Sequence, residues 1–242
     1  MIKFSIIVPA FNEEKYIGQT LHHINLAKVH LSNRGALSAE ILVVDNGSTD
    51  QTACVVQSFG AIVVKESVHN IAKVRNTGAK FASGDILLFI DADTLVPKTL
   101  LLRISQVMSD PSCLGGAVDT DYRPARLSVR LYLKSWRLLG MLADMAQGAV
   151  QFCRRDAYVA LQGYDESIYM GEDVDFYWRL RKSAKERGMR ICHIQDVKVI
   201  PSSRRFDQWP LWRTLVWTNP LFVYFFRRSK GLWSRWYSDV PR

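Results

Sequence analysis

The first half of the chain alternates short β-rich segments with longer segments of helical periodicity, and this alternation constrains the fold most strongly. The β-rich segments are residues 4–8, 40–44, 61–64 and 86–90. Between them, apolar residues recur at helical spacing, as at Ile17, Leu21 and Ile24. Continuous apolar strands separated by helices are typical of a mostly parallel sheet that is covered on both faces. We therefore expect an α/β fold that binds its ligands beyond the carboxyl ends of these strands.

The second half of the chain is less regular. We expect helices over residues 97–108, 127–145 and 174–187, strands over 114–118 and 148–154, and two short strands within 189–200. The sequence contains no internal repeat, low-complexity run or obvious linker. We therefore expect one main domain over residues 1–205 and a C-terminal appendage, dense in aromatic and basic residues, over residues 206–242.

The charge and the cysteines limit the setting in which the chain works. The net charge of +9 favours phosphates, nucleic acid or an anionic membrane surface as partners, without choosing among them. The four cysteines are far apart and form no C-x-x-C pair, so we expect buried free thiols in a reducing compartment. The first apolar segment is short and runs into Pro9, which does not resemble a signal peptide. These features predict a cytoplasmic protein.

Asp91 and Asp93 directly follow the apolar segment 86–90, with Ala92 between them. Residues i and i+2 of an extended segment point the same way, so both carboxylates can face one spot beyond the sheet edge. Adjacent carboxylates repel each other unless a cation lies between them, and Mg²⁺ and Mn²⁺ prefer oxygen ligands. The pattern therefore predicts a metal site. The alternative is a solvated loop whose acids cap the next helix.

Two other expected strands also end in small and polar residues. The residues after them are Pro9, Ala10, Asn12 and Glu13 in the first loop and Asp45 and Asn46 in the second. If the strands are parallel neighbours, these loops lie at the same edge as Asp91 and form a nucleotide pocket. Asp45 could then accept hydrogen bonds from a base or a ribose. The alternative is an ordinary turn with a helix cap.

Charged residues on two expected helices complete the candidate site. Arg75 follows the third strand, where it could face a diphosphate or belong to a solvated basic surface. Glu172 and Asp173 begin a later helix, where one carboxylate could act as a general base toward an acceptor hydroxyl. Asp173 is the first candidate and Glu172 the second. Acidic residues also stabilise a helix N-terminus without any catalytic role.

The order of these segments resembles the family 2 glycosyltransferases, which are inverting enzymes with the GT-A fold. The resemblance extends from about Ile6 to Ile200. It rests on residues 6–13, 43–50, 75–78, 83–85 with 89–94, 163–166 and 171–175, in this order. Each stretch is weak or moderate alone, but their combination is highly specific. The resemblance implies transfer from a nucleoside-diphosphate sugar to a hydroxyl or lipid-phosphate acceptor, assisted by Mg²⁺ or Mn²⁺.

The resemblance also implies roles for individual positions. The residues assigned to the donor nucleotide are Pro9, Ala10, Asn12, Glu13, Asp45, Asn46, Arg75, Asp91 and Ala92. Asp91 would face the ribose or the metal, and Asp93 would bind the metal directly. Asp173 would be the catalytic base, and Gly148 would shape the sugar pocket.

One departure from the family pattern concerns the metal. Many members carry a late histidine that helps to bind it, whereas residues 199–205 of this chain contain none. Arg204 or Arg205 could instead neutralise the phosphates, and we assign both, with Gly148, to the sugar and acceptor pocket. Asp93 would then be the only strong protein ligand. We therefore expect the ion to bind firmly only together with the nucleotide sugar.

The aromatic and basic tail after Trp209 has three interpretations. Tryptophan and arginine together suit peripheral contact with an anionic membrane, here the inner face of the cell membrane. The helices could instead pack on the main domain or on the partner of a homodimer. A spanning helix is disfavoured by Arg213, Pro210 and Pro220. Membrane contact would favour a lipid-linked acceptor.

Two rival functions deserve comparison. Haloacid-dehalogenase-like phosphohydrolases also place D-x-D after a strand, but they prefer a small hydroxyl or β-branched residue where this chain has Leu95. A non-catalytic binder of nucleic acid or anionic lipid would fit the positive charge. Such a binder has no need of converging carboxylates such as Asp91, Asp93 and Asp173, so we expect no nucleic-acid partner.

Overall fold

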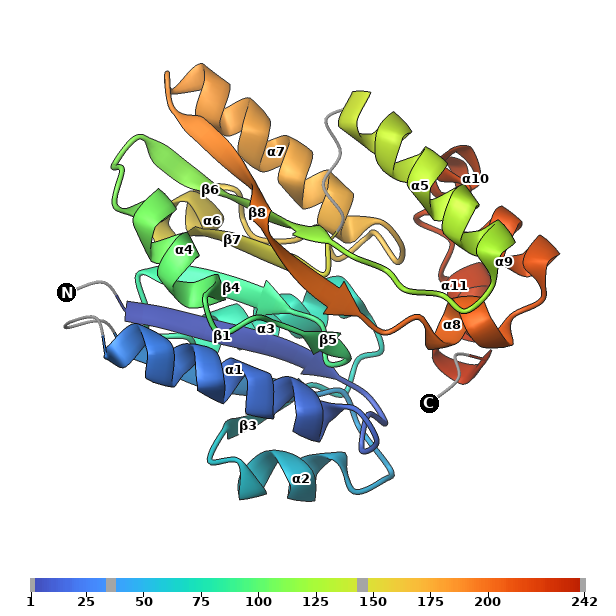
Figure 1. Ribbon diagram of the computed structural model, residues 1–242, viewed down its shortest axis with the longest axis horizontal. Coiled ribbons are helices and arrows are strands. Elements are labelled where there is room, and N and C mark those ends of the chain that lie inside the picture. Colours follow the sequence, from blue (N-terminus) through green and yellow to red (C-terminus); the bar gives the residue numbers. More distant parts are fainter. Residues whose placement is uncertain (1–2, 34–37, 143–147, 240–242) are drawn as a thin grey trace.

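The computed structural model describes residues 3–33, 38–142 and 148–239 (Figure 1). Within them, one sheet has the strand order β3-β2-β1-β4-β7-β6-β8-β5. Its strands are β1 (Lys3–Ala10), β2 (Ser38–Asp45), β3 (Ile62–Lys65), β4 (Ile86–Ile90), β5 (Thr94–Leu95), β6 (Cys113–Thr120), β7 (Val150–Arg154) and β8 (Arg190–Pro201). The first four strands pair in parallel, and β7 joins β4 in the antiparallel direction. The expected parallel sheet is therefore confirmed in the first half and becomes mixed in the second.

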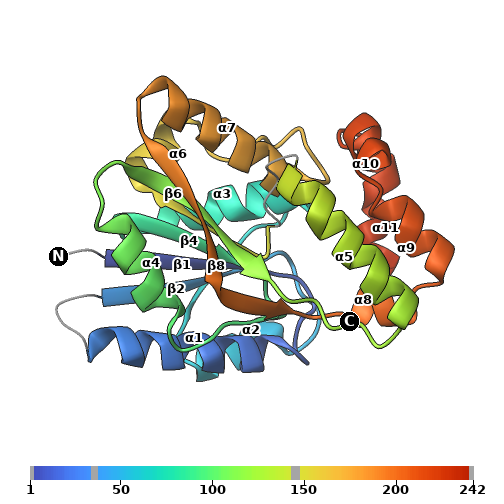
Figure 2. The same cartoon turned by 45° about the horizontal axis from the view of Figure 1, so that its top comes forward.

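Helices cover both faces of this sheet, as the apolar strands predict (Figures 1 and 2). One core layer joins β1 and β4 to α1 (Ile17–Ser32), α2 (Thr52–Ser58) and α4 (Leu100–Met108). The other layer joins the sheet to α3 (Ile71–Phe81), α6 (Arg155–Ala160) and α7 (Glu172–Glu186). A Cβ on Gly78 would lie 2.4 Å from Ile7 and 2.8 Å from Val44. A glycine at this position therefore lets α3 pack closely on β1 and β2.

The second half differs from the expectation most clearly at β8 and at the start of α4. Residues 190–201 form the single strand β8 instead of two short strands. Its pairing with β6 shifts register between Val118 and Asp119, and the strand continues through this shift. The helix expected over 97–108 begins at Leu100. The helix α5 (Leu127–Leu142) matches the one expected over 127–145, whose last three residues lie outside the described ranges.

The cysteines are free, but the expectation that all are buried is wrong. Cys113 and Cys153 are buried and Cys192 is half-buried. Cys54 is exposed, because it lies on the outer side of α2, whose buried residues are Thr52 and Val56.

The C-terminal segment forms a helical layer at the carboxyl edge of the sheet, beside α5 (Figures 1 and 2). Its helices are α8 (Arg204–Gln208), α9 (Leu211–Trp217), α10 (Pro220–Phe226) and α11 (Lys230–Asp239). Trp217 contacts the rings of Trp209 and Trp233, both of which are buried. The Tyr169 N–H donates to the Arg227 carbonyl at 2.7 Å, so this layer also contacts the loop before α7. No helix in the described part of the chain is long and apolar enough to cross a membrane.

Candidate active site

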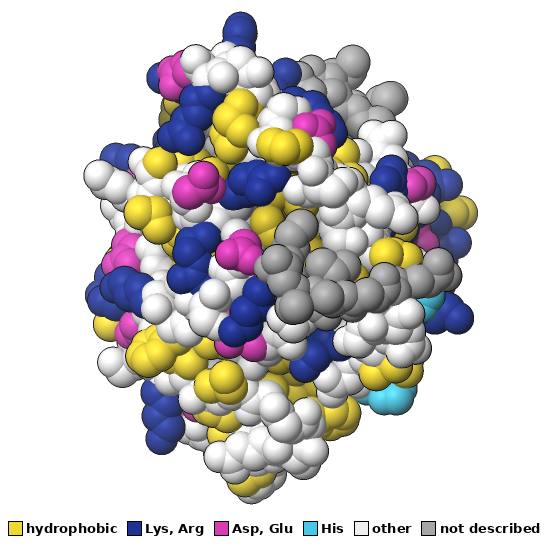
Figure 3. All heavy atoms as spheres, turned by 90° about the vertical axis from the view of Figure 1, so that its left-hand side faces the viewer, with side chains coloured by type: hydrophobic (Ala, Val, Ile, Leu, Met, Phe, Trp, Pro, Cys, Tyr) yellow, Lys and Arg dark blue, Asp and Glu magenta, His cyan; other side chains and the backbone are white. Residues whose placement is uncertain are grey.

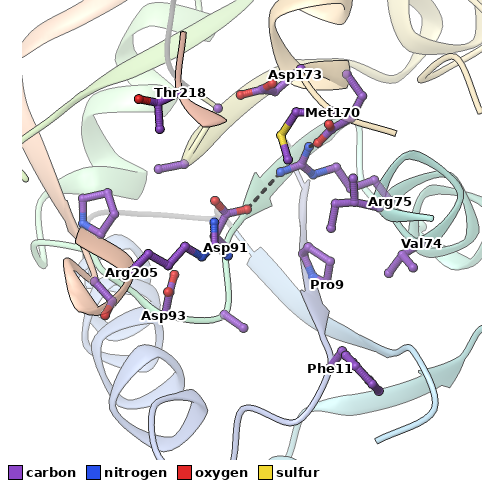
Figure 4. Close-up of a pocket in the computed structure, with 18 of the residues that line it drawn as sticks. Pro9, Phe11, Val74, Arg75, Asp91, Asp93, Met170, Asp173, Arg205 and Thr218 are labelled. Atoms are coloured by element: carbon purple, nitrogen blue, oxygen red, sulfur yellow. Dashed lines mark hydrogen bonds and ion pairs between the residues drawn. The ribbon is translucent and has the colours of Figure 1, made fainter. Parts of the chain in front are cut away.

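A cavity of about 410 Å³ lies between the carboxyl ends of β1 and β4 and the C-terminal helical layer (Figure 4). The candidate residues that line it are Pro9, Ala10, Glu13, Asn46, Arg75, Asp91, Ala92, Asp93, Gly148, Glu172, Asp173 and Arg205. In the view of Figure 4, Asp91 and Arg75 lie between Phe11 on one side and Asp173 on the other. Residues from both halves of the sequence thus meet at the strand ends, where ligands bind in open α/β sheets.

Arg75 links two carboxylates at the floor of the cavity. Its Nη2 lies 2.9 Å from Asp91 Oδ1, and its Nη1 donates to Glu172 Oε1. The guanidinium lies 5.3 Å from the centroid of the Tyr164 ring. The Arg75 side chain is only 4% exposed, whereas 36% of the Asp91 side chain remains accessible. Arg75 therefore orients Asp91 from below, and a ligand can still reach that carboxylate.

Burial changes the acidity of both partners of Arg75. It raises the pKa of Asp91 to about 6, although Arg75 acts in the opposite direction. It raises the pKa of Glu172 to about 7, again against the effect of Arg75. Glu172 is thus enclosed and already paired, which suits positioning more than proton transfer to a substrate.

Asp93 is held by a second buried arginine. Arg204 Nη2 lies 3.2 Å from Asp93 Oδ2, and Arg204 Nη1 donates to Glu13 Oε2 at 2.7 Å. The Arg204 guanidinium also lies 4.3 Å from the centroid of the Tyr16 ring. Arg204 is therefore not part of the cavity lining, contrary to its assignment to the sugar and acceptor pocket. Its guanidinium is occupied beneath the cavity by Glu13 and Asp93, while Arg205 lines the cavity.

Residues 199–205, which contain no histidine, lie beside the carboxylate pair of Asp91 and Asp93. The Ser202 N–H donates to the Asp93 carbonyl at 3.0 Å. The neighbouring Arg204 then contacts the Asp93 carboxylate. This chain therefore places an arginine beside Asp93 from the segment 199–205, which contains no histidine.

Asp173 faces the cavity from the first turn of α7. Its carbonyl accepts a hydrogen bond from Gln151 Nε2 at 2.9 Å, which ties this turn to β7. A Cβ on Gly148 would lie 2.0 Å from Asp173 Oδ2. Gly148 thus leaves the space that the Asp173 carboxylate occupies.

The expected nucleotide loops reach the cavity only in part. Asn46 lines it, with its Nδ2 donating to the Glu66 and Val68 carbonyls at 2.7 and 2.9 Å. Asp45 and Asn12 do not line it. Asp45 Oδ1 accepts from the Ser48 N–H at 3.0 Å, and Asn12 Oδ1 accepts from the Thr49 N–H at 2.8 Å. These two side chains hold the shape of the loops.

Several lining residues were not predicted from the sequence. They are mostly apolar or aromatic: Phe11, Ile71, Val74, Tyr122, Leu133, Met170, Phe206, Trp209, Trp217 and Val223. Trp209 and Trp217 belong to the aromatic tail, for which the sequence leaves both membrane contact and packing on the main domain open. An apolar side chain gives no sign in the sequence of whether it faces a core or a cavity.

The carboxylate pair fits a divalent ion. The described ion pairs use Asp91 Oδ1 and Asp93 Oδ2, so each carboxylate has a second oxygen. Mg²⁺ needs only one or two protein carboxylates, because water and substrate phosphates complete its shell. Among the described residues, no group of three or more His, Cys, Asp or Glu side chains could hold a metal ion. The donor set therefore suits an ion that shares its shell with a phosphate ligand.

Comparison with known proteins identifies the class to which this site belongs. The profile of the family described as "Glycosyl transferase family 2" matches residues 5–157. The chain therefore belongs to the family 2 glycosyltransferases.

The curated relatives are similar over different lengths. The chain is 37% identical over 107 residues to the poly(ribitol-phosphate) β-N-acetylglucosaminyltransferase TarS of Staphylococcus aureus, covering 42% of this chain and 18% of TarS. It is 26% identical over 217 residues to the glycosyltransferase AglE of Haloferax volcanii, covering 84% and 68% of the two chains. The chain thus spans less than a fifth of the length of TarS and about two thirds of AglE.

Solved structures share the GT-A fold. The mannosyltransferase PcManGT of Pyrobaculum calidifontis, in complex with GDP-Man and Mn²⁺, matches with a TM-score of 0.66 and 24% identity. That match covers 87% of this chain and 59% of PcManGT. A TarS structure in complex with UDP-GlcNAc matches with a TM-score of 0.63 and 21% identity, covering 83% and 59%. The expected α/β fold of the GT-A type is thereby confirmed.

Proposed function

We propose that this chain transfers a sugar from a nucleoside-diphosphate sugar to a hydroxyl or lipid-phosphate acceptor, with inversion at the anomeric carbon. The observation that carries this proposal is that Asp91, Asp93, Arg75 and Asp173 line one cavity at the strand ends. The sugar donors named in the complexes of PcManGT and TarS support the same donor class. Residues 1–205 would form the catalytic domain and residues 206–242 the appendage.

The donor nucleotide would lie along the strand ends. Pro9, Ala10 and Asn46 line this side of the cavity, and Phe11 adds an aromatic face there. Arg205 would meet the diphosphate, since guanidinium groups bind phosphate oxygens with two hydrogen bonds. The buried Arg75 would act near the diphosphate through Asp91, which it orients. Glu13, Asn12 and Asp45 would support these contacts by holding the loops.

The residues for a divalent ion lie next to this diphosphate position. Asp93 and Asp91 would hold Mg²⁺ or Mn²⁺ with one oxygen each. When bound, such an ion neutralises the charge that develops on the leaving diphosphate. The Mn²⁺ named in the PcManGT complex supports this assignment.

Asp173 would act as the general base. Its carboxylate faces the cavity, and Gly148 leaves it room. It would take the proton of an acceptor hydroxyl while the acceptor oxygen attacks the anomeric carbon on the face opposite the diphosphate. Glu172 is the weaker candidate, because Arg75 already occupies it.

The outer side of the C-terminal helices supports peripheral contact with an anionic membrane. The large hydrophobic side chains exposed there are Leu211, Trp212, Leu215, Val216, Leu221, Tyr224, Phe225 and Phe226. The face in Figure 3, which is the left-hand side of Figure 1 and lies opposite this layer, instead mixes both signs of charge with scattered hydrophobic side chains. Apolar patches of this kind commonly mark an interaction site. The inner face of the cell membrane is the proposed location.

Thermal unfolding with a panel of nucleoside diphosphates and nucleotide sugars tests the proposed function. We expect at least one nucleotide sugar to raise the melting temperature in the presence of Mn²⁺, since a ligand that binds only the folded state stabilises it. A chelator should abolish most of this shift. If no nucleotide changes the melting temperature, the donor site proposed here is wrong.

A further inference from the structure

The cavity has two chemically different halves. The half at the strand ends carries Asp91, Asp93 and Arg75. The other half, here called the helical wall, is built by α5, the loop before α7 and the C-terminal helices. Its apolar lining side chains are Leu133, Met170, Phe206, Trp209, Trp217 and Val223.

The helical wall suits an alkyl chain better than a sugar. Thr218 also lines it, but its hydroxyl donates to the Thr214 carbonyl at 2.7 Å and lies 2.9 Å from the Tyr132 hydroxyl. The hydroxyls of a sugar need hydrogen-bond partners, because an unpaired buried polar group costs free energy. An alkyl chain needs none.

The helices of this wall are apolar on their outer side as well. Trp217 and Val223 line the cavity, whereas Trp212 is 65% exposed and Phe225 is 76% exposed. On α5, Leu133 lines the cavity and Leu131 is 59% exposed. A helix surrounded by water normally has one polar side, so two apolar sides indicate an apolar environment outside. An alkyl chain could therefore pass from a bilayer to the cavity along apolar helices.

Positive charge surrounds this apolar route. The exposed basic residues on and beside these helices are Arg123, Arg126, Arg130, Lys134, Arg228 and Lys230, of which Arg123 and Arg228 form ion pairs with Asp121 and Asp165. The sequence has no Asp or Glu between residues 122 and 143. Inside the cavity, Arg205 lies beside Asp93, near the boundary between the two halves (Figure 4). This distribution complements an anionic, phosphate-bearing head group.

We propose that the helical wall binds the alkyl chain of a lipid-linked acceptor whose phosphate-bearing head group lies near Arg205. The assignment rests on the glycosyltransferase function proposed above. The acceptor oxygen forms the bond to the anomeric carbon while the bond from that carbon to the donor diphosphate breaks. If the oxygen belongs to a hydroxyl, its proton goes to Asp173.

Binding of alkyl phosphates to the full chain tests this subsite. Calorimetric titration uses dodecyl phosphate below its micellar concentration, with butyl phosphate and inorganic phosphate as comparisons. We expect dodecyl phosphate to bind at a single site at least roughly tenfold more tightly than butyl phosphate, because more apolar surface leaves water. Trp217→Ala and Val223→Ser should each weaken it by roughly tenfold. Trp212→Ser, on the outer side of α9, is the matched control and should leave the affinity unchanged.

Two results would overturn the subsite: equal affinity for dodecyl and butyl phosphate, or equal weakening by Trp212→Ser and Val223→Ser. Val223 lies outside the ring cluster of Trp209, Trp217 and Trp233, so its variant stays informative if Trp217→Ala fails to fold. Nucleotide-sugar hydrolysis by the same preparations separates the two proposals. If the protein hydrolyses a nucleotide sugar but binds dodecyl and butyl phosphate equally, only the alkyl subsite is wrong. If it binds dodecyl phosphate more tightly but hydrolyses no nucleotide sugar, only the proposed function is wrong.

Discussion

At the scale of single residues, the carboxylates of the Asp91–Asp93 pair are each held by a buried arginine. Arg75 contacts Asp91, and Arg204 contacts Asp93. These cations relieve the repulsion between the two carboxylates before any ligand arrives. A divalent ion must therefore bind beside two positive charges, which weakens its hold on the protein alone. In the proposed donor complex, the diphosphate would supply the missing negative charge.

Replacing Asp93 tests this arrangement. We expect Asp93→Ala to weaken nucleoside-diphosphate binding by roughly tenfold or more in Mn²⁺, because a direct ligand is lost. In a chelator the variant and the original chain should bind equally. Asp196→Ala is a suitable control, since Asp196 is an exposed partner of Arg103. Equal weakening with and without metal, measured by calorimetry, would contradict a direct metal role for Asp93.

The proposed base predicts a different pattern. Asp173→Asn should retain donor binding, because the amide has nearly the same size as the carboxylate. Transfer should fall by roughly a hundredfold or more, since the amide cannot accept the acceptor proton. Steady-state kinetics and donor binding on the same preparation check both parts. Transfer that persists with only a shifted metal optimum would remove Asp173 from this role.

The buried Glu172 predicts how stability depends on pH. Burial raises its pKa from 4.5 to about 7, so the folded chain holds a proton more tightly than the unfolded chain. This stabilisation is complete below the unfolded pKa and is lost as the pH rises to about 7. We expect the free energy of unfolding of the ligand-free protein to fall by about 1–3 kcal/mol across this window. Asp91 contributes with the same sign.

Urea unfolding at about pH 5 and about pH 7.5 measures this change. Glu172→Gln should remove a large part of the difference between the two conditions, because its amide does not titrate. The same difference in the variant would assign the dependence to other groups.

The sequence predicted those site residues that carry a charged side chain. Asp91, Asp93, Arg75 and Asp173 are polar or charged at strand ends or helix starts, and all line the cavity. The sequence could not predict that Arg205 lines the cavity while Arg204 pairs with Glu13. The two arginines are adjacent and identical in type, so nothing in the sequence distinguishes them. Phe11 could not be recognised either, since its apolar ring suits a core equally well.

At the scale of elements, the site depends on how α3 and α7 meet the sheet. Helix α3 packs closely on β1 and β2 at Gly78, which brings Arg75 toward Asp91. Helix α7 begins beside β7, where Gln151 holds the backbone of Asp173. The alternation in the first half predicted α3, and the sequence separately predicted a helix over residues 174–187, where α7 lies. It did not predict the single strand β8, because Gln195 and Asp196 interrupt the apolar pattern there, whereas exposed positions of a strand tolerate both.

Gly148→Ala tests the contact between the start of β7 and helix α7. The added methyl group would lie 2.0 Å from Asp173 Oδ2, so the carboxylate must move away. We expect transfer to fall by roughly a hundredfold while donor binding changes little, because a misplaced catalytic group is costly. Gly231→Ala is the matched control, since a Cβ there meets nothing within 4 Å. Unchanged transfer in Gly148→Ala would show that Asp173 does not need its present position.

At the scale of the whole molecule, the C-terminal helices close the carboxyl edge of the sheet and present an apolar outer face. Composition predicted the aromatic and basic character of this segment. It could not predict that Trp217 and Val223 line the cavity while Trp212 and Phe225 face outward, because tertiary packing decides the side.

Vesicle flotation tests the outer face. We expect the chain to float with phosphatidylglycerol vesicles and much less with phosphatidylcholine vesicles, since basic residues attract anionic lipid. Trp212→Ser combined with Phe225→Ser should abolish most of the binding. Trp178→Ser, at an exposed position on α7, is the control. Equal flotation by the double variant would contradict membrane contact through α9 and α10.

Turnover of nucleotide sugars by the purified chain tests the proposed metal-assisted donor site most directly. Release of nucleoside diphosphate is measured for a panel of nucleotide sugars with Mn²⁺ and again with a chelator. We expect at least one of them to be hydrolysed, even without an acceptor, and we expect the chelator to stop the reaction. Absence of turnover across the panel, or turnover that ignores the chelator, would contradict the assignment of Asp91 and Asp93 to a metal-assisted donor site.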